Sequence, residues 1–120
     1  MARKTLLEIP IPIGRAIALE LARQGVAVAV NDVDDRAAAA VCEEITRTDE
    51  RALPLCCDVA ESGAVKRGVS RLSETWAAPE ILVNNAGFRQ YAPFEEISED
   101  QWDRMLAVHL KGAFNPSCPA

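Results

Sequence analysis

The chain has 120 residues, with 13 Lys and Arg against 18 Asp and Glu, so its formal net charge is −5 at pH 7. Its 49% hydrophobic and 26% charged residues are typical of one globular domain and argue against a disordered chain or a disulfide scaffold. The negative charge and the lack of a Lys/Arg cluster disfavour a nucleic-acid partner. No apolar run reaches the roughly 18 residues of a membrane-spanning helix, so we expect no membrane partner.

The first third of the chain predicts a helix followed by a buried strand. Apolar residues recur at the spacing of one helix face from Ile13 to Leu21, and Gly25 can end this helix, over about 14–24, in a left-handed conformation. The Val and Ala run 26–30 is typical of a strand that is buried on both faces of a parallel sheet.

A second helix and strand follow. Asp34 or Asp35 can cap a helix that runs through the alanine-rich stretch to about Thr48. The apolar segment 52–57 predicts the next strand. Because Pro54 lacks a backbone N–H, we expect this strand at an edge of the sheet.

The last part of the chain predicts two more helices with a short strand between them. An apolar stripe from Val65 to Trp76 indicates the first helix, and 81–83 the strand. Ser98 and Gln101 form a capping box, which begins a helix that runs to about residue 113. Strands that alternate with helical connections predict an α/β fold with a parallel sheet covered on both sides.

The four cysteines show no paired C-x-x-C spacing, and two of them, Cys56 and Cys57, lie in an apolar run that resembles a buried strand. This favours reduced thiols in a cytosolic protein over a disulfide or a zinc site. Two prolines and a glutamate interrupt any signal-peptide core in the first 12 residues. We therefore expect a cytoplasmic location.

In a doubly wound parallel sheet, ligands bind beyond the carboxyl ends of the strands. Four segments are expected there: the helix start at Gly14, the strand-end residues Asp32 and Asp58, and the turn 84–87. The last three of these segments have a plainer interpretation as well. Asp32 could cap a turn, Asp58 could favour a helix start, and 84–87 could be an ordinary Asn/Gly turn.

Together these motifs resemble the N-terminal half of a short-chain dehydrogenase/reductase. The similarity covers residues from about 13 to 115 and rests on Ile13–Ala18, Asp58-Val59, the N-N-A-G turn Asn84–Gly87, and Trp102–Phe114. The resemblance implies half of a Rossmann-like sheet with strand order 3-2-1-4. It places a partial dinucleotide-binding domain in 1–115 and an irregular tail in 116–120.

The resemblance also implies a cofactor site for NAD or NADP. In the family the first turn and Asp58 surround the pyrophosphate and adenine, the acid at Asp32 favours NAD, and the N-N-A-G turn lies on the nicotinamide side. The implied cofactor-binding residues are Ile13, Gly14, Asp32, Asp58, Val59, Asn85, Ala86 and Gly87. We expect weak binding that prefers NAD.

The weak binding is expected because the first turn departs from the family pattern T-G-x-x-x-G-x-G. The stretch Glu8–Gly14 is about two residues short and keeps only the last glycine. Glu8 brings negative charge toward the pyrophosphate, and two prolines remove backbone N–H donors.

A second departure is His109, which replaces an asparagine that organises a proton-relay water. It is either a substitute relay or, more plainly, a hydrogen-bonded helix histidine.

The family's catalytic serine and Y-x-x-x-K pair are expected beyond residue 120, and the only tyrosine, Tyr91, is followed four residues later by Glu95. No catalytic residue is therefore assigned, and the chain is interpreted as a short-chain oxidoreductase that is inactive as this fragment. The substrate is not indicated.

The alternatives to this function are a non-catalytic nucleotide-binding or dimer-interaction module and a degenerate gene product. We also expect a homo-oligomer, since the apolar strand 81–83 would form an unprotected sheet edge.

Overall fold

The computed structural model describes residues 2–4 and 13–118. Its centre is one sheet of four parallel strands in the order β3-β2-β1-β4. The strands are β1 (Ala2–Lys4), β2 (Val28–Asn31), β3 (Ala52–Leu55) and β4 (Leu82–Val83). Ala2 of β1 pairs with Ala29 on one side and with Leu82 on the other. The predicted α/β class and strand order 3-2-1-4 are confirmed.

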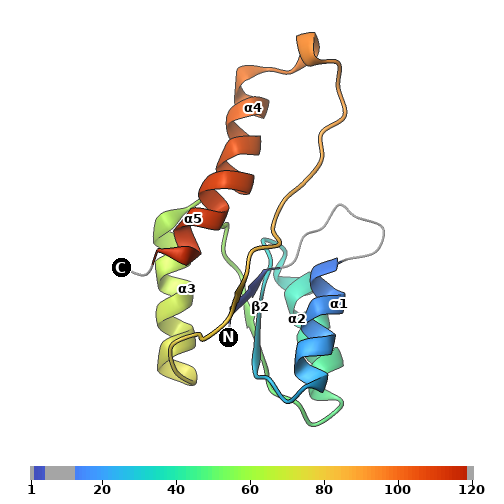
Figure 1. The fold of residues 1–120 in the computed structure, drawn as a ribbon, viewed down its shortest axis with the longest axis vertical. Coiled ribbons are helices and arrows are strands. Elements are labelled where there is room, and N and C mark those ends of the chain that lie inside the picture. Colours follow the sequence, from blue (N-terminus) through green and yellow to red (C-terminus); the bar gives the residue numbers. More distant parts are fainter. Residues whose placement is uncertain (1, 5–12, 119–120) are drawn as a thin grey trace.

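Helices cover both faces of this sheet (Figure 1). Two lie on one face, α1 (Ile13–Arg23) and α2 (Asp35–Thr46), and two on the other, α3 (Ser62–Thr75) and α5 (Gly112–Ser117). The side chains of β2 explain this layering, because alternate residues of a strand point to opposite faces. Val28 and Val30 pack in a cluster with α1 and α2, whereas Ala29 packs with Leu72 of α3.

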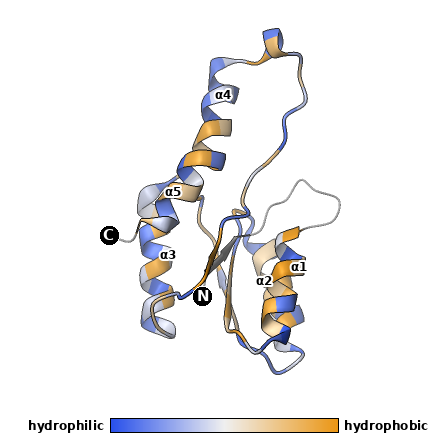
Figure 2. Cartoon of the chain, in the orientation of Figure 1, coloured by the Kyte–Doolittle hydropathy of each residue, from blue (hydrophilic) through white to orange (hydrophobic). Residues whose placement is uncertain are grey.

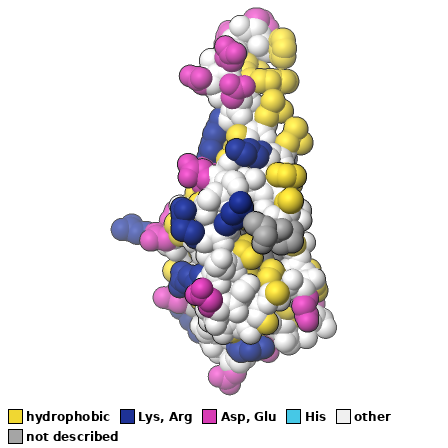
Figure 3. All heavy atoms as spheres, turned by 90° about the vertical axis from the view of Figure 1, so that its left-hand side faces the viewer, with side chains coloured by type: hydrophobic (Ala, Val, Ile, Leu, Met, Phe, Trp, Pro, Cys, Tyr) yellow, Lys and Arg dark blue, Asp and Glu magenta, His cyan; other side chains and the backbone are white. Residues whose placement is uncertain are grey.

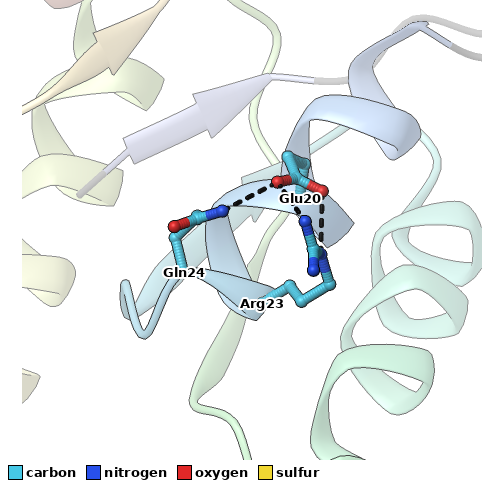
Figure 4. A network of polar contacts seen from close by, with 3 residues as sticks. All are labelled: Glu20, Arg23 and Gln24. Atoms are coloured by element: carbon cyan, nitrogen blue, oxygen red, sulfur yellow. Dashed lines mark hydrogen bonds and ion pairs between the residues drawn. The ribbon is translucent and has the colours of Figure 1, made fainter.

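The helix ends follow the predicted local chemistry. Gly25 follows α1 with φ +84°, and the side chain of Asp34 caps α2 by accepting from the N–H groups of Arg36 and Ala37. On the exposed surface of α1, Glu20 accepts hydrogen bonds from Arg23 and Gln24, as Figure 4 shows. These hydrogen bonds lower the pKa of Glu20 to about 2.

Strand β3 lies at the sheet edge, as Pro54 predicted, but it is shorter than expected. It ends at Leu55, and Cys56 is exposed, so the placement of both cysteines inside a buried strand was wrong. Arg51 and Leu55 direct their carbonyl groups at β2, where they accept from Val28 and Asp32. Since alternate residues of a strand face opposite edges, the nitrogen of Pro54 faces the outer edge, where no N–H is required.

Beyond β4 the chain forms an arm that projects from the sheet (Figure 1). A 3-10 turn, η1 (Phe94–Glu96), precedes α4 (Glu99–Leu106), which begins at the predicted Ser98–Gln101 capping box. None of the residues of α4 is buried. The arm gives the molecule its long dimension, with extents of 50 × 33 × 20 Å. Figure 2 shows apolar and polar bands alternating along α4.

The predicted helix 98–113 is interrupted by a π-turn, η2 (Ala107–Lys111), where the N–H of Gly112 donates to the carbonyl of Ala107. The helix then continues as α5 through Ser117, so the predicted irregular tail at 116–120 begins too early. Pro116 removes one donor from the last turn. The Ser117 hydroxyl, which donates to Ala113 at 2.7 Å, and the Cys118 N–H, which donates to Phe114 at 3.0 Å, hold that turn.

Candidate functional site

The carboxyl ends of β2, β3 and β4 lie at the same edge of the sheet, because the strands are parallel. Asp32 follows β2, Asp58 and Val59 follow β3, and the turn Asn84–Gly87 follows β4. The loops that carry these predicted residues therefore meet at one sheet edge. This is the position at which doubly wound sheets bind their ligands.

Asp32 is the most deeply buried charged residue of this edge, with 1% of its surface exposed. Its Oδ1 accepts from the backbone N–H of Asp34 at 3.0 Å, whereas its buried Oδ2 has no hydrogen-bond partner among the described residues. Burial raises the pKa of Asp32, and the hydrogen bonds from Asp34 and Val33 only partly offset that rise. As pH rises above the ordinary carboxyl value, ionised Asp32 therefore lowers the free energy of unfolding.

Asn31, which the sequence analysis did not single out, joins the loops after β2 and β3. Its Nδ2 donates to the carbonyl of Cys57 at 3.0 Å, and its Oδ1 accepts from the Cys57 N–H at 2.9 Å. Asn31 is buried. The only signal in the sequence was the position of Asn31 between a buried Val/Ala run and an aspartate. That signal does not distinguish an asparagine that bonds to a distant loop from one that forms a local turn.

Asp58 is held by two contacts on the same carboxylate. Oδ1 accepts from the N–H of Ala60 at 2.9 Å, and Oδ2 forms an ion pair with Arg104 of α4 at 2.9 Å. The first contact forms the turn before α3, close to the predicted role at a helix start. The second, which no local spacing indicated, ties the edge of the sheet to the projecting arm.

Val59 and Ala86 pack in one cluster with Val108 of the π-turn. Asn115 of α5, which is also buried, donates to the carbonyl of Val59 at 2.8 Å. A Cβ at Gly112 would lie 2.6 Å from Val59 Cγ2, so glycine is needed where α5 crosses this loop. The end of β3, the N-N-A-G turn and the last helix thus form one packed unit.

The imidazole of His109 lies against the N-N-A-G turn. Its Nε2 is 3.1 Å from the N–H of Phe88 and 2.8 Å from the Phe88 carbonyl, so one tautomer accepts from the N–H and the other donates to the carbonyl. The rings of His109 and Phe88 are 5.7 Å apart. A Cβ at Gly87 would overlap the imidazole. His109 is thus a hydrogen-bonded histidine, but its partner is Phe88, the residue after the N-N-A-G turn, and not its own helix.

The glycine turn before α1 is only partly described. Gly14 is buried at the start of α1 and Ile13 is half exposed. Glu8, Pro10 and Pro12 lie outside the described residues. The described side chains contain no group of His, Cys, Asp and Glu placed to hold a metal ion. No helix within 13–118 is long and apolar enough to cross a membrane.

Comparison with known proteins gives consistent matches. The chain is 37% identical over 103 residues to Probable oxidoreductase EphD of Mycobacterium tuberculosis, covering 86% of this chain and 17% of that protein. A short-chain dehydrogenase/reductase mutant of Serratia marcescens superposes with a TM-score of 0.84 at 32% identity, covering 97% of this chain and 47% of that one.

A gluconate 5-dehydrogenase of Burkholderia cenocepacia, solved in complex with NADP and tartrate, superposes with a TM-score of 0.80 at 31% identity, covering 96% of this chain and 46% of that one. The chain spans less than half the length of these proteins. The family model for short chain dehydrogenases matches residues 12–118. With the strand order and the N-N-A-G turn in place, the chain belongs to the short-chain dehydrogenase family.

Proposed function

We propose that this chain binds a nicotinamide dinucleotide along the carboxyl edge of its sheet and is the cofactor-binding half of a short-chain oxidoreductase. The observation that carries the proposal is the buried, unpartnered Oδ2 of Asp32. A buried carboxylate oxygen without a donor is costly, and a ribose hydroxyl would supply the missing hydrogen bond. The residues present therefore fit a dinucleotide, which supplies or accepts a hydride when bound.

The other predicted residues support the same edge. The turn after Asp58 would border the adenine, and the contact of buried Val59 with Ala86 holds that turn beside the N-N-A-G segment. Gly87 is buried beneath the His109 ring and keeps the turn close to the last helix. Ile13 and Gly14 would present the start of α1 to the pyrophosphate, whose negative charge suits a helix N-terminus.

NAD should bind more tightly than NADP, and both should bind weakly. The family accommodates both cofactors, and the Burkholderia neighbour was solved with NADP. In this chain ionised Asp32 would repel a 2′-phosphate but accept from a 2′-hydroxyl. Glu8 and the neighbouring prolines would weaken the pyrophosphate contact.

Titration calorimetry with both cofactors tests this preference. Asp32→Asn keeps the size of the side chain and removes the charge. It should therefore weaken NAD binding by about tenfold or more and reduce the difference between the affinities for NAD and NADP. Asp35→Asn removes the same charge three residues away on the exposed start of α2 and serves as the control. Equal binding of NAD and NADP by the unmodified chain would show that Asp32 does not face the ribose.

The 120-residue chain should show no dehydrogenase or reductase turnover. Hydride transfer to a carbonyl needs a proton donor, which contributes roughly 10²- to 10⁴-fold. Tyr91 does not supply a Y-x-x-x-K pair, since Glu95 stands in the place of the lysine. Tyr91 is 85% exposed and its hydroxyl contacts Arg89.

Absorbance of NADH and NADPH, followed with a panel of ketones and alcohols, measures this turnover. A full-length short-chain reductase in the same assay is the positive control. Turnover by the purified chain at a comparable rate would contradict the expectation that the catalytic serine and Y-x-x-x-K pair lie outside these 120 residues. Cofactor binding without turnover is the expected combination.

A second candidate function is a dimer-interaction module, favoured by one surface. Trp102, Leu106, Leu110 and Phe114 recur every four residues along α4, η2 and α5 and are 50%, 39%, 66% and 63% exposed. We refer to these four residues as the arm stripe. Figure 3 shows hydrophobic side chains along one edge of the projecting arm. Exposed apolar surface of this kind usually marks an interface.

A further inference from the structure

One face of the last helical segments packs against the loop that follows β3. The residues that make these contacts recur every four positions: Arg104, Val108 and Gly112. The guanidinium of Arg104 forms an ion pair with Oδ2 of Asp58 at 2.9 Å. Val108 packs in one cluster with Val59, and a Cβ at Gly112 would lie 2.6 Å from Val59 Cγ2. Arg104 is therefore the polar end of a row whose other two members make apolar contacts.

This face of α4 is distinct from the arm stripe. Each residue of an α-helix turns the chain by about 100°, so Arg104 lies about 160° around α4 from both Trp102 and Leu106. No residue of α4 is buried, so packing in a core does not fix the orientation of this helix. The ion pair with Asp58 supplies a directional contact where burial does not.

Arg104 also has a carboxylate closer by in the sequence. Asp100 precedes it by one helical turn, the spacing at which ion pairs commonly form along a helix. Among the described residues, however, Arg104 pairs with Asp58 and Asp100 forms no ion pair within 4 Å. Asp58 is the least exposed carboxylate of the three ion pairs, at 27% against 38% and 55%, so water and salt screen this contact least.

The carboxylate of Asp58 shapes the loop between β3 and α3. Its Oδ1 accepts from the N–H of Ala60 at 2.9 Å, and its backbone carbonyl accepts from the N–H of Glu61 at 3.0 Å. With Arg104 on Oδ2, both oxygens of the carboxylate are held. Without Arg104, the carboxylate would keep only the hydrogen bond to Ala60, and the loop would be less ordered.

We propose that Arg104 is a positioning residue of the dinucleotide site, which acts through Asp58 and orders the loop that borders the ligand. The inference rests on the proposed function, in which this loop lies beside the adenine. A loop that is ordered before binding loses little conformational freedom when the ligand arrives, so its affinity for the ligand is higher. Arg104 needs no contact with the dinucleotide to produce this effect.

Titration calorimetry with NAD tests this role. Arg104→Gln should weaken NAD binding by about three- to fivefold, the upper range for a partly exposed ion pair. Arg104→Lys keeps the charge and should restore most of the affinity. In the Asp58→Asn background, Arg104→Gln should have little further effect, because the group through which Arg104 acts is gone. A guanidinium that attracts the phosphates directly, or a substitution that only loosens the fold, would weaken binding equally in both backgrounds.

Hydrogen exchange of the Ala60 N–H measures the ordering of the loop without a ligand. This N–H donates to Oδ1 of Asp58, so Arg104→Gln should speed its exchange by about three- to fivefold. Arg23→Gln is the matched control, because it removes an exposed ion pair with Glu20 in the last turn of α1. It should change neither the exchange of Ala60 nor the affinity for NAD.

The outcomes separate this inference from the proposed function. NAD binding that is insensitive to Arg104→Gln, or that weakens equally in both backgrounds, overturns the role of Arg104 and leaves the proposed function in place. Unchanged exchange of the Ala60 N–H in Arg104→Gln also overturns it. Failure of the unmodified chain to bind NAD overturns the proposed function, and the inference about Arg104 falls with it.

Discussion

Replacing Gly87 with alanine should destabilise the fold by about 1–3 kcal/mol and abolish dinucleotide binding. The new Cβ would lie 2.9 Å from Nδ1 of His109 and closer still to Cε1. Gly87 is not among the described residues with positive φ, so the backbone itself admits alanine. The destabilisation therefore comes from displacing the imidazole, which also breaks its hydrogen bond with Phe88.

A double-mutant cycle tests that cause. His109→Ala alone should lose about 1 kcal/mol with its hydrogen bond, and the double variant should be less destabilised than the sum of the two single variants. Urea unfolding measures the stabilities and calorimetry measures NAD binding. Gly63→Ala is the matched control, because its Cβ would meet only the flexible end of Arg67, at 3.3 Å. Additive effects of the two substitutions would contradict the predicted clash.

The isolated chain should self-associate, with a sedimentation coefficient that rises with concentration. Two surfaces lack a cover within the described residues: the outer edge of β4, which pairs only with β1, and the arm stripe defined above. An open strand edge offers unpaired N–H and C=O groups, and the arm stripe offers apolar area. A second copy of the chain can cover both.

Two lysine variants distinguish these surfaces in analytical ultracentrifugation. Leu82→Lys places a charge at the strand edge, and Leu110→Lys places one in the arm stripe. The lysine variant in the surface that forms the contact should weaken association by about tenfold or more. The reason is that burying a leucine side chain contributes roughly 1.5–3 kcal/mol to the free energy of association. Ser73→Lys adds the same charge on the exposed surface of α3 as a control. A compact monomer with a cooperative melt would contradict the prediction.

The sequence predicted those parts of the fold that depend on local rules. The helix starting at Asp35 followed from its cap, the helix at Glu99 from its capping box, and the edge position of β3 from Pro54. The strand order came from the family resemblance. The two caps and Pro54, in contrast, each lie within a few residues of the feature that they predict.

The differences arose where contacts between distant segments decide the structure. Cys57 continued an apolar run, but β3 pairs with β2 only as far as Leu55, and the Cys57 N–H donates to the side-chain Oδ1 of Asn31, 26 residues earlier. The π-turn ends at Gly112, where a Cβ would clash with Val59, and no helical periodicity reveals this contact. In the same way, Oδ2 of Asp32 is buried and lacks a hydrogen-bond partner among the described residues. The sequence alone showed only an aspartate near a turn.

The outward nitrogen of Pro54 also limits how large an assembly this sheet could form. A sheet grows when further strands pair with its edges. A proline whose nitrogen faces the edge offers no N–H, so an added strand would lack one backbone hydrogen bond there. Because β3 is blocked in this way and β4 has no outer neighbour among the described residues, a further strand can pair with the described sheet only at β4. Two copies joined through β4 would carry a blocked β3 at both ends, so growth would terminate in a closed pair with two-fold symmetry and not in a fibre.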